Sequence, residues 1–245
     1  MLGMTTTSNA NTTGVRDIAE SLGGGIREGS LVLIEGGAKA GKSVLSQHVT
    51  YGVLCAKDSS VAYYTLDANI EDLIVQMDSL SLETRHDFVT DRFRIYSLGP
   101  AQAPEYAEKE LQNIITHISY LPDRFKLIVI DSAAPLMAHV STMIQIDFLQ
   151  SCKELCENGR SIVLALDTHI FERRTISRAY AMSDYYIRLT SQDMMLDAGQ
   201  VDTRVVKVLE VIKIAGAERP VPEGVKFEIK PRIGIQILPF VKVKV

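Results

Sequence analysis

A glycine-rich segment between an apolar stretch and an expected helix constrains this chain more than any other feature. It spans residues 31–43 and contains the spacing Gly36-x-x-x-x-Gly41-Lys42-Ser43. In a phosphate-binding loop with this spacing, backbone N–H groups surround a β-phosphate, the lysine reaches the β/γ oxygens and the hydroxyl holds Mg²⁺. The alternative is a strand-to-helix turn without a ligand. The apolar strand before the loop and the helix expected after it favour the phosphate-binding loop.

The predicted nucleotide-binding residues are those of the loop itself. Glycine is required where the backbone turns with a positive φ or approaches an anion closely, because a Cβ would block both. The helix that begins near Ser43 adds the positive end of its dipole. We therefore predict that nucleotide is bound by Gly36, Gly37, Ala38, Lys39, Ala40, Gly41, Lys42, Ser43 and Val44, with Ser43 also a ligand of Mg²⁺.

A second strong pattern lies at residues 125–132, where a run of large apolar residues ends in Asp131 and Ser132. A continuous apolar run is typical of a strand buried on both faces. An acidic residue at the carboxyl end of such a strand, in a chain with a phosphate-binding loop, is the expected Walker B partner of Mg²⁺. Alone the pattern is weak, because apolar strands ending in Asp are common. Together with Lys42 and Ser43 it predicts Asp131 as the second protein ligand of the metal.

Two further apolar stretches end in polar residues at the place where open α/β sheets position their chemistry. Residues 61–66 are followed by Asp67, which we take as a candidate catalytic carboxylate. Residues 161–166 are followed by Asp167, Thr168 and His169. His169 is either a residue that contacts the γ-phosphate or a hydrogen-bonded loop histidine, and both interpretations stay open.

Hydrophobic periodicity and turn residues place the other elements. Helices are expected over residues 15–22, 43–58, 70–80, 104–120 and 142–157, and strands over 93–98, 185–189, 205–213, 226–229, 233–237 and 241–245. The alternating lysines of the last segment suit an edge strand. The predicted fold is α/β: a mostly parallel central sheet flanked by helices, with an antiparallel β-rich C-terminal end. One domain is expected over residues 14–245, after a disordered tail over 1–13.

Charge and composition exclude several classes of protein. A formal net charge of −4 gives no overall attraction for nucleic acid or an anionic membrane. No apolar run approaches the ~18 residues needed to cross a bilayer, so membrane association is expected only through partners. Cys55, Cys152 and Cys156 form no C-x-x-C pair. Cys152 and Cys156, four residues apart on an expected helix, fit two buried thiols better than a metal or redox site, and a reducing cytoplasm is the expected location. The basic cluster at 172–174 and Arg178 is either a solvated helix face or a partner surface.

With these features in place, the chain resembles the RecA-like ATPases of the KaiC group. The likeness is carried by Gly23–Gly36, which enters the phosphate-loop strand, and by the loop itself. The single short domain and the segment Gly41–Gln47 are most similar to the FlaH (ArlH) subfamily, the accessory ATPases of the archaellum motor. The resemblance implies ATP and Mg²⁺ as ligands and a homo-oligomeric, often hexameric, ring. It also implies the archaellum motor ATPase and its membrane core and scaffold proteins as partners.

Two departures from the family pattern concern hydrolysis. Active KaiC-group ATPases carry one or two glutamates after the second strand, where this chain has the shorter Asp67. A small misplacement of a catalytic group can cost ~100-fold in rate. The family's late Lys-x-Arg pair reads Lys213-Ile214-Ala215 here, and an arginine supplied in trans can be worth ~10³. We therefore expect ATP binding with slow or absent hydrolysis, so that nucleotide acts as a switch.

Other functions remain open on the sequence alone. A KaiC-like signalling ATPase or autokinase, with Ser or Thr as phosphate acceptor, differs from the accessory ATPase in its partners. A RecA-type recombinase is the weakest candidate, because the chain is acidic and lacks a basic glycine-rich loop for a phosphate backbone. Whether Arg173, Arg174 or Arg219 replaces the missing arginine from a neighbouring subunit also stays open.

Overall fold

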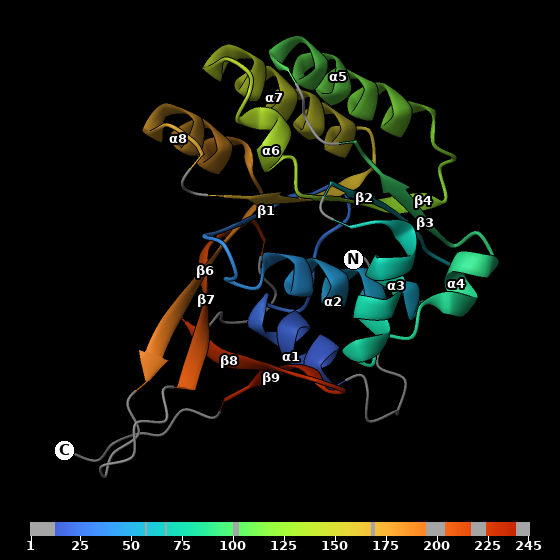
Figure 1. Ribbon diagram of the computed structural model, residues 1–245, viewed down its shortest axis with the longest axis vertical. Coiled ribbons are helices and arrows are strands. Elements are labelled where there is room, and N and C mark those ends of the chain that lie inside the picture. Colours follow the sequence, from blue (N-terminus) through green and yellow to red (C-terminus); the bar gives the residue numbers. More distant parts are fainter. Residues whose placement is uncertain are drawn as a thin grey trace.

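The computed structural model describes residues 13–56, 58–66, 68–99, 103–167, 170–194, 204–216 and 224–238. A single nine-stranded sheet runs through these segments, in the order β3-β2-β4-β5-β1-β6-β7-β8-β9 (Figure 1). No helix in these segments is both long enough and apolar enough to cross a bilayer.

The first six strands are parallel and carry the predicted site at their carboxyl ends. They are β1 (Leu31–Gly36), β2 (Ser60–Thr65), β3 (Phe93–Ser97), β4 (Phe125–Asp131), β5 (Ser161–Leu166) and β6 (Tyr185–Met194). Every residue of β1, β2 and β5 is buried. Burial on both faces explains why these strands read as continuous apolar runs rather than as alternating patterns. Because the strands are parallel, the loops that follow β1, β4 and β5 meet at one edge of the sheet.

The last three strands are antiparallel and bend back under the molecule. They are β7 (Arg204–Ile214), β8 (Val225–Lys230) and β9 (Gly234–Ile237). Figure 1 shows β8 and β9 passing beneath α1 (Thr13–Ser21) and α2 (Lys42–Leu54), and both helices pack against β9. The C-terminal strands therefore enclose the helix that follows the phosphate-binding loop.

Helices cover both faces of the parallel strands and create two hydrophobic cores. One face carries α1, α2, α3 (Ile70–Ser79) and α4 (Arg85–Val89), and the other carries α5 (Pro104–Tyr120), α6 (Ala134–Met137), α7 (Thr142–Glu157) and α8 (Arg173–Met182) (Figure 1). Successive residues of a strand point to opposite faces. Tyr63 accordingly belongs to the core beneath α2, and Tyr64 belongs to the core beneath α5 and α7.

Most predicted elements are confirmed, and the differences have physical reasons. The helices at 104–120 and 142–157 have the predicted bounds, and Asn69 caps α3 by accepting from Asp72 N. Helices α4 and α6 were missed, because four or five residues are too few to show a helical period. Strand β6 extends the parallel set rather than opening the antiparallel one. The predicted strand 241–245 and residues 1–12 of the predicted tail lie outside the described segments, whereas Thr13 begins α1.

The two predicted buried thiols, Cys152 and Cys156, are confirmed, and Cys55 is also a free cysteine. Cys152 and Cys156 are buried on α7, while Cys55 is partly buried. Burial raises the pKa of Cys156 to about 12, so its thiol stays protonated at neutral pH. These side chains act as small core residues.

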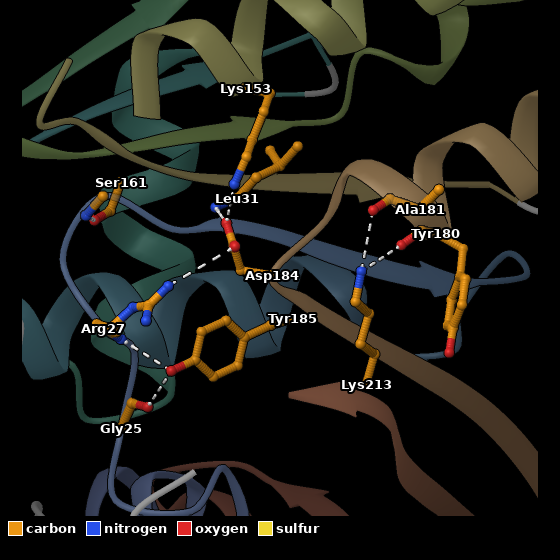
Figure 2. Close-up of polar contacts among 11 residues, drawn as sticks. Gly25, Arg27, Leu31, Lys153, Ser161, Tyr180, Ala181, Asp184, Tyr185 and Lys213 are labelled. Atoms are coloured by element: carbon orange, nitrogen blue, oxygen red, sulfur yellow. Dashed lines mark hydrogen bonds and ion pairs between the residues drawn. The ribbon is translucent and has the colours of Figure 1, made fainter. Parts of the chain in front are cut away.

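An ionic contact fixes the amino end of β1, opposite the phosphate-binding loop. The Oδ2 atom of Asp184, just before β6, accepts from Leu31 N at 2.9 Å and from Lys153 Nζ at 2.7 Å (Figure 2). The Tyr185 hydroxyl accepts from Arg27 N at 3.0 Å and lies 3.3 Å from Gly25 O, to which it donates. The segment that enters β1 is thus tied to β6 and α7 before the chain reaches the site.

Candidate nucleotide-binding site

The phosphate-binding loop connects the carboxyl end of β1 to the first turn of α2. An ideal Cβ on Gly36 would lie 2.8 Å from Leu189 O and 3.0 Å from Ala40 Cβ, so no larger residue fits there without movement. Gly41 has φ 104° and Lys39 has φ 62°, both in the left-handed region. A glycine-rich turn followed by the amino end of a helix is an arrangement that suits an anion, because free backbone N–H groups and the positive end of the helix dipole lie together there.

Lys42 lies within the concave side of the loop. Its Nζ donates to the carbonyl oxygens of Gly36 at 2.8 Å and Gly37 at 2.9 Å, and lies 3.6 Å from Asp167 Oδ2. The lysine side chain is only 12% exposed. The ammonium is therefore held between the loop and the end of β5, where it can exchange carbonyl contacts for phosphate oxygens. The contact with Asp167 was not predicted, because the order of the strands was unknown from the sequence.

Ser43 and Asp131, the two predicted metal ligands, are in direct contact. Ser43 Oγ in the first turn of α2 donates to Oδ1 of Asp131 at 3.1 Å, although 88 residues separate them. The other oxygen, Oδ2, accepts from the Tyr63 hydroxyl at 2.5 Å. Such a short O–H···O distance is typical of a hydroxyl that donates to an ionised carboxylate. Tyr63 was not predicted; the alternation of faces along β2 was the only signal that could have indicated it.

The residues present fit a magnesium–nucleotide complex. Mg²⁺ in such sites is held by one or two protein oxygens together with phosphate oxygens and water. Ser43 and Asp131, which are hydrogen-bonded to each other, could supply two such oxygens, and the loop could supply backbone groups for the phosphates. Within the described segments there is no group of three or more His, Cys, Asp or Glu residues that could hold a metal by themselves. The arrangement therefore suits a metal that binds together with the nucleotide.

The C-terminal strands brace the loop from outside. Lys207 Nζ in β7 donates to the carbonyl oxygen of Lys39. A Cβ on Gly41 would lie 3.3 Å from Ile229 Cδ1 and 3.4 Å from Lys207 Cδ, so β7 and β8 approach the loop closely. Burial lowers the pKa of Lys207. None of these contacts could be inferred from sequence spacing.

A pocket of about 350 Å³ opens beside the loop on the β6 side. It is lined by Glu35, Gly36, Gly37, Ala38, Ala40, Arg188, Leu189, Thr190 and Ser191. Arg188 Nε lies 3.5 Å from Oε2 of the buried Glu35. Burial and a hydrogen bond to Glu35 raise the pKa of Tyr186. The pocket is within the size range of small-molecule sites and is lined by four of the predicted nucleotide-binding residues.

The remaining predicted residues divide into two groups. Val44 is half-buried in α2, and its carbonyl oxygen lies 2.8 Å from His48 Nδ1. Asp67 and His169 lie outside the described residues, as does Arg219, so their proposed roles stay predictions.

Lys213, the residue expected from the sequence to begin a Lys-x-Arg pair, contacts its own chain. Its Nζ donates to the carbonyl oxygens of Tyr180 at 2.9 Å and Ala181 at 3.1 Å, in the last turn of α8 (Figure 2). It also lies 5.2 Å from the centre of the Tyr180 ring. A cation at the carboxyl end of a helix satisfies otherwise free carbonyl groups. Ala215, at the arginine position, donates its backbone N–H to Asp184 O at 2.8 Å.

Comparison with known proteins assigns the family. The model of the family described as "ATPase: KaiC" matches residues 11–242. The chain belongs to the KaiC ATPase family. An archaeal flagellar ATP-binding protein FlaH from Sulfolobus acidocaldarius is 26% identical over 230 residues, covering 93% of this chain and 96% of the relative. The protein of the same name from Methanocaldococcus jannaschii is 24% identical over 227 residues, covering 90% and 91%.

Solved structures support the KaiC-type fold of this family member. The crystal structure of the flagellar accessory protein FlaH from M. jannaschii superposes with a TM-score of 0.76 at 21% identity, covering 91% of this chain and 96% of that one. A KaiC-like protein from Pyrococcus horikoshii superposes with a TM-score of 0.66 at 20% identity, covering 90% and 94%. At these identities the likeness concerns the fold.

Proposed function

We propose that this KaiC-family protein is an ATP-binding accessory protein of an archaellum-type motor. In this role, Mg-ATP acts as a switch for ring assembly and partner docking, with slow or absent hydrolysis. The observation that carries the proposal is that Lys42, Ser43 and Asp131 lie together at the carboxyl edge of the sheet. Lys42 donates to the loop carbonyl of Gly36, and Ser43 donates to Asp131. The names of the similar relatives, archaeal flagellar ATP-binding proteins, support the motor system.

Contacts among Lys42, Ser43, Asp131 and Asp167 support the binding part of the proposal. Lys42 lies between the loop and Asp167, from where its ammonium can turn toward the phosphate oxygens. Ser43 and Asp131 offer oxygens to Mg²⁺ from α2 and β4. The loop residues 36–44 would bind the phosphates, and the pocket next to β6 would take part of the remaining ligand.

The residues expected to catalyse hydrolysis differ from those of active family members. Asp67 is one methylene shorter than the glutamate of active family members, and Ala215 stands where they carry arginine. Lys213 is bound to the end of α8 in its own chain, which supports a role in holding α8 rather than in reaching a neighbour's phosphate. An arginine provided in trans can contribute ~10³ or more to the rate, so its loss favours a long-lived ATP complex.

In this proposal the protein forms a homo-oligomeric ring in the cytoplasm, hexameric by analogy with the family. Its partners would be the motor ATPase and the membrane core and scaffold proteins of the archaellum, and it would reach the membrane only through them. No nucleic-acid role is proposed, because the net charge is −4. Light scattering with and without Mg-ATP tests the assembly: a nucleotide-dependent rise in mass is expected, and an unchanged monomer would contradict the ring.

Nucleotide binding and turnover by the purified chain test the central claim. Mg-ATP should bind, whereas turnover should stay far below about 1 s⁻¹, the lower end of typical enzymes. Lys42→Ala should abolish binding while the circular dichroism spectrum stays native, because it removes the phosphate-binding ammonium without touching the core. Retained binding in Lys42→Ala would contradict the phosphate-loop assignment, and turnover above 1 s⁻¹ would contradict the switch. Transfer of labelled γ-phosphate to the protein would favour an autokinase instead.

A further inference from the structure

The hydroxyl of Tyr63 makes a contact that the proposed function does not yet use. Tyr63 lies in the middle of β2 with no exposed surface, and its hydroxyl donates to Asp131 Oδ2 at 2.5 Å. The opposite oxygen, Oδ1, accepts from Ser43 at 3.1 Å. The carboxylate of Asp131 is therefore held from both sides, with one oxygen on the tyrosine and the other facing the loop.

The register of the sheet explains how Tyr63 reaches this carboxylate. Tyr63 is paired with Val129 in β4, and Asp131 lies two residues further along the same face. The long tyrosine side chain spans this diagonal offset, as its 2.5 Å hydrogen bond to Asp131 Oδ2 shows. The Tyr63 ring also packs edge-on against Phe93 in β3, with ring centres 6.3 Å apart and planes at 89°. A rigid ring in a packed core gives the hydroxyl a fixed position.

We propose that Tyr63 is a positioning residue for the metal side of the nucleotide site. The inference rests on the proposed function, since it concerns the same Mg-nucleotide complex. The terminal torsion of an aspartate is broad, so an unrestrained carboxylate samples many orientations. A hydroxyl bound to Oδ2 restricts that rotation and leaves Oδ1 directed at Ser43 and the metal. Removal of such a supporting partner costs 10–100-fold in metal affinity in other sites.

Tyr64 provides a matched control on the same strand. It follows Tyr63, is 1% exposed, and its hydroxyl is hydrogen-bonded to His117 Nδ1 at 2.7 Å. Its ring points to the other core and stacks on Tyr96 with centres 5.0 Å apart. Tyr64→Phe thus removes a buried, hydrogen-bonded hydroxyl from β2 without changing the surroundings of Asp131.

The test is a Mg²⁺ titration of the binding of a fluorescent ATP analogue to the full chain. Tyr63→Phe should raise the Mg²⁺ concentration for half-maximal binding about tenfold, whereas affinity for the analogue in EDTA should stay unchanged. Tyr64→Phe should stay within about twofold of the wild type in both measurements. A Tyr63→Phe variant that matches Tyr64→Phe in its Mg²⁺ dependence would overturn the positioning role while leaving ATP binding intact.

An Asp131→Ala background gives a second measurement, which also serves if the single Tyr63→Phe variant does not fold. With no carboxylate to position, Asp131→Ala and the double variant should show the same Mg²⁺ dependence. A further shift in the double variant would overturn the proposal. If the wild type and Tyr64→Phe bind no analogue with or without Mg²⁺, both the ATP-binding function and the role of Tyr63 fail.

Discussion

His48, one helical turn beyond the loop, is a buried histidine held in its neutral form. Its Nε2 accepts from Ile235 N at 3.0 Å, so the proton resides on Nδ1, which lies 2.8 Å from Val44 O and donates to it. Burial lowers the pKa of His48 to about 4, against an ordinary value of 6.5. The imidazole therefore connects α2 to β9 only while it remains uncharged.

The free energy of unfolding should decrease as the pH falls from 6.5 toward 4. In this window the unfolded chain binds a proton on His48 and the folded chain does not. The contribution of His48 to the free energy of unfolding is therefore fully present above pH 6.5 and decreases by roughly 1 kcal/mol for each pH unit below it. Urea unfolding of the wild type and of His48→Gln across this range measures the difference, since carboxylates titrate equally in both. A wild-type slope equal to that of His48→Gln would contradict the assignment.

At the residue scale, the sequence predicts the parts of the site that are local or follow a strand. Lys42 and Ser43 belong to one motif, and Asp131 ends an apolar run, so all three could be named in advance. Asp167 and Tyr63 contact those residues only because of the strand order and the β2–β4 register. These are tertiary properties that spacing along one chain does not encode.

Gly234, the first residue of β9 after the turn from β8, occupies a position that is restricted both by its backbone and by its neighbours. Gly234 has φ +81°, and a Cβ there would lie 2.3 Å from His48 Nε2 and 3.2 Å from Leu80 O. Gly159 has φ +92° and nothing within 4 Å of an ideal Cβ. The two glycines therefore share a backbone requirement but differ in their surroundings.

Gly234→Ala should destabilise the fold considerably more than Gly159→Ala. The control should lose about 1 kcal/mol for a non-glycine residue in the left-handed region. The Gly234 variant adds a clash that displaces His48 or β9, for a total loss of roughly 3 kcal/mol. Thermal or urea unfolding of both variants measures the difference in their free energies of unfolding. Equal decreases in the two variants would contradict the expected clash at Gly234.

The sequence predicts individual helices and strands better than it predicts which strands pair in the sheet. The helices at 104–120 and 142–157 follow directly from apolar periodicity with a terminal Pro or Asn-Gly. The segment 93–98 was expected as part of a connection, yet β3 is the edge strand of the main sheet. It pairs with β2, which ends 28 residues before β3 begins. No local sequence feature indicates that these two strands pair.

Ligand binding should be visible in the stability of the whole molecule. A ligand that binds only the folded state adds about 2.7 kcal/mol at 100 times its Kd. For a domain of this length, that corresponds to a rise in Tm of roughly 5–10 °C. Saturating Mg-ATP should produce this rise in the wild type and none in Lys42→Ala, as differential scanning fluorimetry can measure. An equal rise in both proteins would place the nucleotide elsewhere.

The closure of the molecule by its last strands also sets an order of events during synthesis. An ideal Cβ on Gly14 in α1 would lie 2.6 Å from Ile235 O in β9, so the two ends of the described chain meet at close range. During translation α1 and α2 are synthesised well before β8 and β9. Contacts between segments so far apart in the sequence form late in folding. The nascent chain must keep the apolar side of both helices covered or unstructured for the length of some two hundred residues. The loop gains its contacts with Lys207 and Ile229 only once β7 and β8 have been synthesised, so a ligand that needs the braced loop would bind late in the synthesis of this domain.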